Sequence, residues 1–321
     1  MMRKQVLVFD QKAAWYASAL SKLCPGYDFV TATEPDEVVR KGGEAAVLVA
    51  LAPSVGRDMV AAMPRLEWVQ ALTTGVDNLL TMPELGPQVA ITNCRGIHGP
   101  QMSELAMLLM LALARRFPQI VRNQARAVWE RWPQPLLAGR TICIVGLGAI
   151  AEDLARRCAP FQMRVTGVSD GRAEVDGFAA VYRRADIARA VADADFVVVV
   201  VPYSRATHHL VGQDVLAAMR PEAFLINLSR GGCVDEPALL AALAAGTIAG
   251  AGLDVFNTEP LPVASPFWGL PNVIVTPHIG GMSDTYHEQA LPLVAANLDA
   301  YARQGAGGLA GRIERNHKES A

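Results

Sequence analysis

Three residues in the C-terminal half of the chain have side chains suited to anion binding and acid–base chemistry: Arg230, Glu259 and His278. Each comes just beyond an apolar segment that reads as a strand, so parallel strands would bring all three to one edge of a sheet. Hydride transfer to a 2-keto acid needs a planar cation, a proton donor that works near neutral pH, and a carboxylate that orients the donor. Alone, each residue is more often a surface ion pair, a capping acid or a satisfied histidine, but the three together indicate chemistry.

A glycine turn upstream indicates a cofactor. The apolar run at 141–145 leads into G-x-G-x-x-A and then a helix-compatible run, which is typical of a dinucleotide site. Gly146 permits the sharp turn, Gly148 lets a pyrophosphate approach the backbone, and Ala151 lets the helix pack closely. The alternative is a glycine turn in an ordinary buried βα unit. The candidate cofactor contacts here are Gly146, Leu147, Gly148, Ala149 and Ile150.

The residues about 20 positions beyond the glycines would read the ribose. The apolar segment at 164–169 ends in Ser169, and Asp170 and Arg172 follow. Asp170 could accept a hydrogen bond from a ribose 2′-hydroxyl, which favours NAD, whereas Ser169 and Arg172 could receive the 2′-phosphate of NADP. A solvated turn is the alternative, and these residues alone leave the choice of cofactor open.

Apolar segments that alternate with helical ones predict an α/β fold with two doubly wound parallel-sheet domains. The expected strands are 5–10, 27–32, 45–51, 66–72 and 89–92, then 141–145, 164–169, 194–202, 223–229, 248–255 and 273–276. The expected helices are 101–115, 185–192, 214–219, 237–245 and 283–303. An irregular connection is expected around residues 129–135, and an irregular tail at 305–321.

The helix expected at 283–303 has no strand after it and could return to the first domain. We therefore expect a discontinuous substrate domain, residues 1–98 plus 284–321, and a nucleotide-binding domain at 99–283. The helix at 101–115 is apolar nearly all round and should be buried, either within the chain or against a second subunit. His98, at the glycine- and proline-containing junction, is expected to be structural or solvent-facing.

One loop of the first region is chemically suggestive. Residues 73–78 directly follow an expected strand, where ligands of parallel sheets bind. The backbone amides of Gly75 and Val76 could hold a carboxylate. A simple βα turn capped by Asp77 or Asn78 explains the same residues equally well.

Composition indicates a compact globular protein, since 51% of the 321 residues are hydrophobic and 19% are charged. The formal net charge of −2 and the lack of a basic block do not favour nucleic acid as a partner. The N-terminus does not match a signal peptide, and the longest apolar run is too short for a membrane span. The five cysteines have neither metal-site nor disulfide spacing, so we expect no metal and a reducing cytoplasm.

Over nearly its whole length the chain resembles the D-isomer-specific 2-hydroxyacid dehydrogenase family. The motifs that carry the resemblance lie at 75–78, 146–148, 227–232 and 277–281. The resemblance implies that Arg230 binds the substrate, that Glu259 partners the histidine, and that His278 is the acid/base. It also implies that the amides of Gly75 and Val76 hold the substrate carboxylate.

The family resemblance has further implications for fold, cofactor and assembly. It implies a Rossmann nucleotide-binding domain inserted into a flavodoxin-like substrate domain, with the active site in the cleft between them. It implies a homodimer formed through the nucleotide domain, and a small 2-keto or 2-hydroxy acid as the substrate. Asp254 is implied to receive the nicotinamide carboxamide. The other implied cofactor contacts are Pro202, Thr207, Ser229 and Gly280.

The segment at 259–268 is most similar to the glyoxylate/hydroxypyruvate reductase branch, whose members often prefer NADPH. Ser169 and Asp170 depart from that branch, which tends to have basic residues there, so NADPH is favoured by the resemblance and NAD by Asp170. A formate dehydrogenase of the same fold is disfavoured because that branch pairs its histidine with glutamine, not with a residue like Glu259. The alternative from another class is an NAD(H)-sensing protein like the related corepressors.

Overall fold

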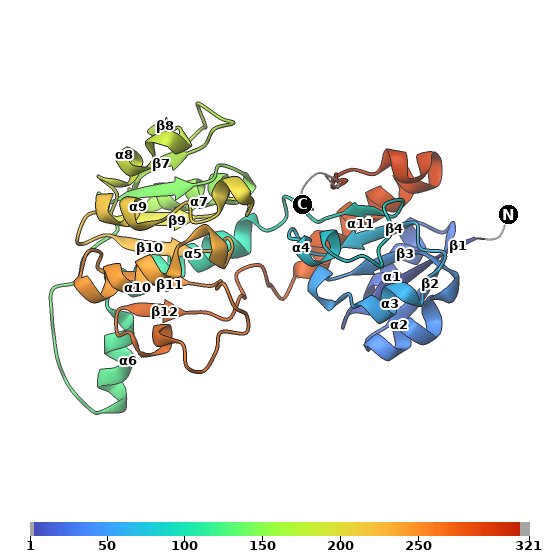
Figure 1. Cartoon of the computed structure of the whole chain (residues 1–321), viewed down its shortest axis with the longest axis horizontal. Helices are drawn as coiled ribbons and strands as arrows, with labels where there is room; N and C mark the ends of the chain where they lie inside the picture. The colour runs from blue at the N-terminus through green and yellow to red at the C-terminus, as the bar shows by residue number, and fades with distance from the viewer. Residues whose placement is uncertain (1–2, 315–321) are drawn as a thin grey trace. The chain divides into compact units, whose positions relative to one another are not determined.

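The computed structural model describes residues 3–314 of the chain as two compact units (Figure 1). The first unit runs up to Ile97 and resumes at Ser283, and the second unit is His98–Met282. The sequence placed both junctions one residue later, after residues 98 and 283. The chain therefore leaves the first unit once and returns to it, and the second unit is an insertion.

The first unit is built on a parallel sheet of five strands in the order β2-β1-β3-β4-β5. This is the flavodoxin-like order, as expected from the resemblance. The central strand β3 is buried at every position, because hydrophobic clusters cover both faces of the sheet. The strands are β1 (Lys4–Phe9), β2 (Tyr27–Ala32), β3 (Ala45–Ala50), β4 (Trp68–Ala71) and β5 (Ala90–Thr92).

The long C-terminal helix α11 (Tyr286–Gln304) packs in the first unit, where Figure 1 shows it in red among the blue elements. The Tyr27 hydroxyl donates to the Leu298 carbonyl at 2.7 Å. The Asn297 amide donates to Gln70 of β4 at 2.8 Å. The other helices of this unit are α1 (Ala13–Leu23), α2 (Pro35–Lys41), α3 (Arg57–Ala61) and α4 (Asp77–Leu80).

The tail that follows α11 is more ordered than the sequence indicated. Gly305–Gly308 forms a 3₁₀ turn, and Leu309 is buried in the core of the first unit. Arg312 then forms an antiparallel bridge with Thr92 at the edge of β5. The expectation of an irregular tail is therefore wrong for Gly305–Gly308 and for Arg312, where the tail pairs with an open sheet edge, and residues 315–321 lie outside the described part.

The second unit contains a parallel sheet of seven strands in the order β12-β11-β10-β9-β6-β7-β8. The strand before the glycine turn, β6, lies inside the sheet between β9 and β7, so the strand order reverses there as in a Rossmann fold. The expected fold class is thus confirmed. The strands are β6 (Thr141–Val145), β7 (Arg164–Val168), β8 (Ala180–Tyr182), β9 (Phe196–Val199), β10 (Phe224–Asn227), β11 (Gly250–Leu253) and β12 (Val273–Val275).

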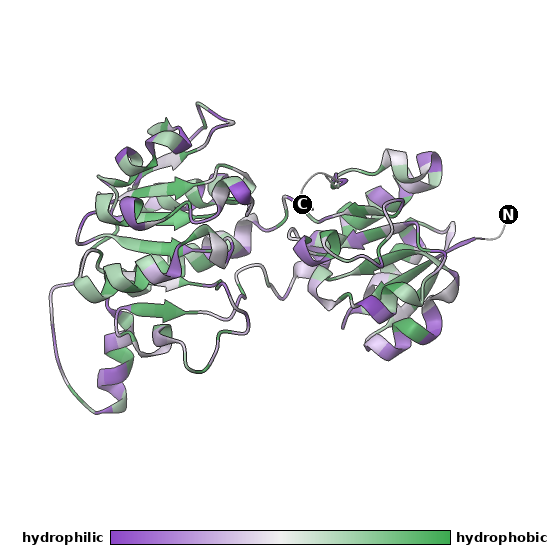
Figure 2. Cartoon of the chain, viewed as in Figure 1, coloured by the Kyte–Doolittle hydropathy of each residue, from purple (hydrophilic) through white to green (hydrophobic). Residues whose placement is uncertain are grey.

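Helices cover both faces of this second sheet, and the strands form the most hydrophobic layer (Figure 2). The apolar helix α5 is largely buried, as expected: its Leu109 lies 3.2 Å from where a Cβ on Gly252 of β11 would stand. The helices are α5 (Gly99–Ala114), α6 (Phe117–Ala125), α7 (Ala149–Cys158), α8 (Ile187–Val191), α9 (Gln213–Ala218) and α10 (Glu236–Ala245). Among the described residues, no helix combines the length and apolarity needed to cross a membrane.

Candidate active site

The glycine turn between β6 and α7 has the geometry of a phosphate cradle. Gly146 has a φ of +101°, and a Cβ there would lie 2.7 Å from the backbone of Val201, so no other residue fits. Gly148 precedes α7 in extended conformation, and a Cβ there would meet nothing within 4 Å. The open space at Gly148 and the amides at the start of α7 fit a dinucleotide pyrophosphate.

The neighbours of these glycines support the turn through packing. Ala151 is fully buried, so the helix approaches the sheet closely. The Leu147 side chain packs on β7, since a Cβ on Gly167 would lie 2.7 Å from its Cδ2. Leu147 therefore offers its backbone, and not its side chain, to a ligand. Ala149 and Ile150 are the first residues of α7, where backbone N–H groups have no partner within the helix.

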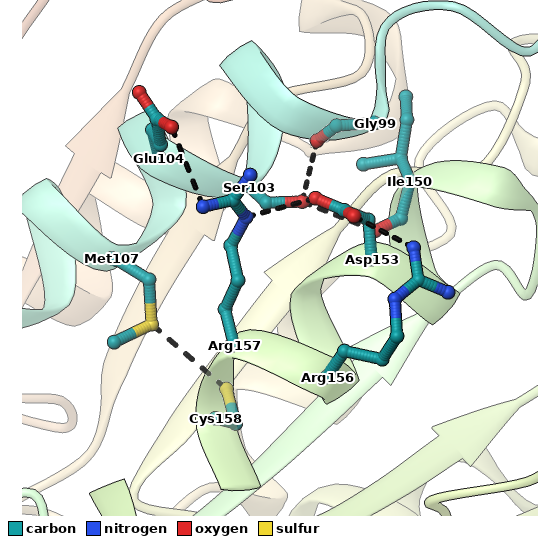
Figure 3. A network of polar contacts seen from close by, with 9 residues as sticks. All are labelled: Gly99, Ser103, Glu104, Met107, Ile150, Asp153, Arg156, Arg157 and Cys158. Atoms are coloured by element: carbon teal, nitrogen blue, oxygen red, sulfur yellow. Dashed lines mark hydrogen bonds and ion pairs between the residues drawn. The ribbon is translucent and has the colours of Figure 1, made fainter. Parts of the chain in front are cut away.

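A polar network fixes α7 against α5 (Figure 3). The Asp153 carboxylate accepts from Arg156 at 2.7 Å and from Arg157 at 2.9 Å. It also accepts from Ser103 of α5, whose hydroxyl lies 2.6 Å from the Gly99 carbonyl. Burial alone would raise the pKa of Asp153, but these hydrogen bonds outweigh it and hold the pKa below its ordinary value. The network anchors the helix that carries the phosphate cradle.

The loops after β11 and β12 bring Glu259 and His278 together. Nδ1 of His278 lies 2.6 Å from Oε2 of Glu259, and the other carboxylate oxygen accepts from the Phe256 amide at 2.9 Å. The carboxylate is thus held from two sides and fixes the orientation of the imidazole. Within the described residues, Nε2 of His278 has no hydrogen-bond partner, and the side chain is 45% exposed. This nitrogen can therefore exchange a proton with a bound molecule.

Asp254 holds the backbone of the histidine loop. Its carboxylate is 1% exposed and accepts from the Thr276 hydroxyl at 2.6 Å, the Ile279 amide at 3.0 Å and the Gly280 amide at 2.9 Å. The Asp254 carbonyl accepts from the His278 amide, also at 2.9 Å. His278 has a φ of +54°, a left-handed conformation that a non-glycine residue adopts only when its surroundings impose it. Asp254 supplies that constraint.

Arg230 lies on the loop after β10, which is organised by the buried Asn227. The Asn227 side chain accepts from the amide and hydroxyl of Ser229 and donates to the Arg230 carbonyl at 3.0 Å. A Cβ on Gly231 would lie 2.0 Å from the backbone of Phe256, so this loop contacts the loop that carries Glu259. Neighbouring strands β10, β11 and β12 therefore supply the three residues expected to do chemistry. Sequence reasoning missed the organising role of Asn227, whose only signal was its place at a strand end.

Thr207 and Pro202 lie on the loop after β9. The Thr207 side chain is buried, donates to the Pro202 carbonyl at 2.8 Å and accepts from the Ser204 amide at 2.7 Å. Its hydroxyl therefore shapes the loop. The Tyr203 ring lies on Gly232, where a Cβ would stand 2.6 Å from it. The loop after β9 is thus packed against the loop of Arg230.

The three residues expected to read the ribose lie at the end of β7. The Ser169 hydroxyl accepts from the Gly171 amide at 3.2 Å, and Arg172 forms an ion pair with Glu152 of α7. Asp170 forms an ion pair with Arg184, whose backbone amide also donates to it at 2.9 Å. Sequence reasoning missed Arg184, because its partner lies 14 positions earlier in the chain.

Gly75 and Val76 belong to the first unit, whereas Arg230, Glu259 and His278 belong to the second. The Thr73 hydroxyl donates to the Gly75 carbonyl at 2.7 Å, and Val76 is the buried residue that precedes α4. His98 is buried with its ring 3.4 Å from where a Cβ on Gly281 would stand, which confirms its structural place. No group of potential metal ligands occurs among residues 3–314.

Comparisons with known proteins identify relatives of the chain in sequence and in structure. Residues 107–280 match the family model described as D-isomer specific 2-hydroxyacid dehydrogenase, NAD binding domain. The glyoxylate/hydroxypyruvate reductase B of Pectobacterium carotovorum subsp. carotovorum (strain PC1) is 34% identical over 286 residues, which cover 86% of this chain and 84% of that protein.

Two solved structures share the fold over almost the whole chain. A D-isomer specific 2-hydroxyacid dehydrogenase family protein from Aeromonas salmonicida subsp. salmonicida A449 has a TM-score of 0.89 and 34% identity, with 98% of this chain and 100% of that chain covered. An NADPH-dependent glyoxylate/hydroxypyruvate reductase from Sinorhizobium meliloti, in complex with NADP and sulfate, has a TM-score of 0.81 and 27% identity. That match covers 98% of this chain and 99% of that chain.

Proposed function

The chain belongs to the D-isomer specific 2-hydroxyacid dehydrogenase family, and we propose that it reduces a small 2-keto acid of the glyoxylate or hydroxypyruvate kind to the D-2-hydroxy acid. It is an NAD(P)-dependent dehydrogenase. The observation that carries the proposal is the 2.6 Å pair of His278 and Glu259, with Nε2 of the histidine open to a ligand.

When bound, the nicotinamide supplies the hydride. His278 gives a proton from Nε2 to the carbonyl oxygen of the substrate, which would otherwise become an alkoxide. Glu259 orients the ring through Nδ1 and stabilises its positive charge before the proton leaves. Arg230 binds the carboxylate and carbonyl of the keto acid with its planar guanidinium.

Further residues are proposed to hold the reactants. The amides of Gly75 and Val76 bind the substrate carboxylate. Asp254 keeps the histidine loop in place and receives the nicotinamide carboxamide. The glycine turn holds the pyrophosphate, and Pro202, Thr207, Ser229 and Gly280 line the cofactor.

NADPH is the proposed preferred cofactor. Two observations support this preference: Arg172 lies at the end of β7, and the related Sinorhizobium meliloti enzyme is NADPH-dependent. Arg172 and the Ser169 hydroxyl would contact the 2′-phosphate.

A steady-state panel tests the proposed reaction. NADPH and NADH are each combined with glyoxylate, hydroxypyruvate, pyruvate and phenylpyruvate, and the product of hydroxypyruvate is resolved by chiral chromatography. We expect turnover with glyoxylate or hydroxypyruvate, faster with NADPH, and the D-isomer as product. Tight nucleotide binding without turnover of any keto acid would instead indicate a nucleotide sensor.

We also propose a homodimer formed through the second unit. The helix α6 and the segment after it expose Phe117, Ile120, Val121, Val128, Leu136 and Trp129, the last of which is 92% exposed. Such an apolar patch marks an interaction surface. Sedimentation equilibrium should give twice the mass of one chain, and the mass of a single chain would contradict the dimer.

All five cysteines are unpaired, which supports the proposed location in a reducing cytoplasm.

A further inference from the structure

The acid at the end of β7 is already occupied within the protein. Oδ1 of Asp170 accepts from the Arg184 backbone amide at 2.9 Å, and Oδ2 lies 3.3 Å from Nε of the same arginine. One residue thus engages both carboxylate oxygens. An enzyme that selects NAD uses an acid at this position to accept from the ribose hydroxyls. In this chain Asp170, whose side chain is 50% exposed, is already paired with the positive charge of Arg184.

Arg184 is itself held by two partners, Asp170 and the Ala206 carbonyl. It follows β8, the edge strand that pairs with β7, and begins the 3₁₀ turn Arg184–Asp186. Its Nη1 donates to the Ala206 carbonyl at 3.1 Å, which ties it to the loop after β9. The side chain is only 32% exposed, so the guanidinium has little freedom to leave Asp170. It lies where the end of β7 meets the loop proposed to line the cofactor.

We infer that Arg184 sets the cofactor specificity of this chain by neutralising Asp170, so that a 2′-phosphate is accepted where an unpaired carboxylate would repel it. This inference rests on the proposed preference for NADPH and deepens it. Without Arg184, the charge of Asp170 would face the phosphate, and like charges at short range cost binding energy. With Arg184 in place, the charge of Asp170 is paired with a guanidinium that also contacts the loop after β9.

A second ion pair near the end of β7 also joins an arginine to an acid. Arg172 pairs with Glu152 of α7, so the charge of Glu152 is also neutralised. The Ser169 hydroxyl accepts from the Gly171 amide, and its own proton is available for donation to a phosphate oxygen. Arg184 differs from Arg172 because it engages the residue expected to discriminate between the two cofactors.

Calorimetric titration of the full chain with two nucleotide fragments tests the inference. Adenosine 2′,5′-bisphosphate and adenosine 5′-monophosphate differ only in the 2′-phosphate. In Arg184→Ala we expect the affinity for the bisphosphate to fall by about 10- to 100-fold, the value of a charge-assisted contact, while the monophosphate changes by no more than about twofold. The matched control is Arg183→Ala, which removes one exposed positive charge from the neighbouring position and should change neither affinity by more than about twofold.

The double variant Arg184→Ala/Asp170→Asn shows whether Arg184 acts by neutralising the charge of Asp170 or only by holding the loops in place. If Arg184 acts by neutralising Asp170, removal of the carboxylate charge restores much of the lost affinity for the bisphosphate. Arg184→Gln, which keeps a donor for Ala206, should show the same selective loss if the alanine variant folds poorly. Equal losses for both fragments, no loss, or no recovery in the double variant would each overturn the inference.

The binding measurement does not depend on turnover. The role of Arg184 and the proposed reaction can therefore be refuted independently of each other. A selective loss in a chain that reduces no keto acid would refute the reaction and leave the role of Arg184 intact. Turnover with NADPH combined with an unchanged bisphosphate affinity in Arg184→Ala would refute Arg184 alone.

Discussion

At the scale of single residues, the proposed chemistry depends on side chains whose positions are set by buried partners. Asp254 fixes the backbone of His278 and of the two residues after it, and Asn227 fixes the turn before Arg230. The residue types of the three chemical groups were readable from the sequence, because each follows a strand end. The role of Asp254 in holding the histidine loop was not, because its donors lie more than 20 positions later in the chain and leave no local pattern.

Arg230→Lys tests the need for a planar guanidinium. Lysine keeps the charge but loses the bidentate contact, which is worth about 2–3 kcal/mol for a charged group. Steady-state kinetics should show kcat/KM for the keto acid lower by roughly 30- to 150-fold, with a higher KM and a lower kcat. Arg220→Lys is the control, because Arg220 pairs with Asp195 before β9 and β10 begin, and should change little. An unchanged kcat/KM in Arg230→Lys would remove Arg230 from the site.

At the scale of elements, the two glycines of the turn between β6 and α7 are needed for different reasons. Gly148 leaves room for the nucleotide, whereas Gly146 is needed for the fold itself. Gly148→Val adds a side chain into open space, so the thermal midpoint should stay within about 2 °C while nucleotide affinity is lost. Gly146→Ala drives a Cβ into the backbone of Val201 and forces a left-handed conformation on alanine, so the midpoint should fall by several degrees. Calorimetry and nucleotide titration measure both effects. A stable Gly148→Val variant that still binds nucleotide would show that the pyrophosphate does not use this turn.

The contact between α5 and α7 predicts an acid-sensitive contribution to stability. A lowered pKa means that Asp153 stabilises the fold above the unfolded-state value of about 3.9, and that this stabilisation disappears as the pH falls below it. Asp153→Asn should lower the free energy of unfolding by about 1–2 kcal/mol at pH 7, with the difference shrinking below about pH 4. Denaturant titrations at several pH values measure it.

The control for that experiment is Glu104→Gln on the same interface. Glu104 lies 3.3 Å from Arg157 but its side chain is 70% exposed, so its loss should cost less than about 0.5 kcal/mol. If Asp153→Asn costs no more than Glu104→Gln at pH 7, the network does not anchor α7.

At the scale of the whole molecule, the pattern of apolar residues in the sequence predicted the buried central strands. It missed the edge strand β8, the helix α6 and the order of the C-terminal tail. Central strands such as β3 and β9 are continuous apolar runs, which only a sheet covered on both faces requires. The edge strand β8 is only three residues long and all three are partly exposed, and α6 is amphipathic beside an irregular segment. The order of the C-terminal tail depends on its bridge to β5, a pairing that no local sequence signal reports.

The family and the two parallel sheets follow from motifs and patterning, and the comparisons confirm them. Cofactor preference was not decided by the residues after β7, because Asp170 and Arg172 point to different cofactors. Their ion-pair partners, Arg184 and Glu152, come from other segments and could not be read from the sequence.

The central claim is that Glu259 and His278 act as one unit in proton transfer, and a double-variant cycle tests it most directly. Turnover of the keto acid is measured for the wild type, Glu259→Gln, His278→Ala and the double variant, with nucleotide affinity as the check on folding. His278→Ala should reduce kcat by about 10²- to 10⁴-fold, and Glu259→Gln should reduce it less. Because Glu259 acts only through the ring, the double variant should be no slower than His278→Ala alone. Losses that multiply in the double variant would show that the two residues work independently and would contradict the proposed mechanism.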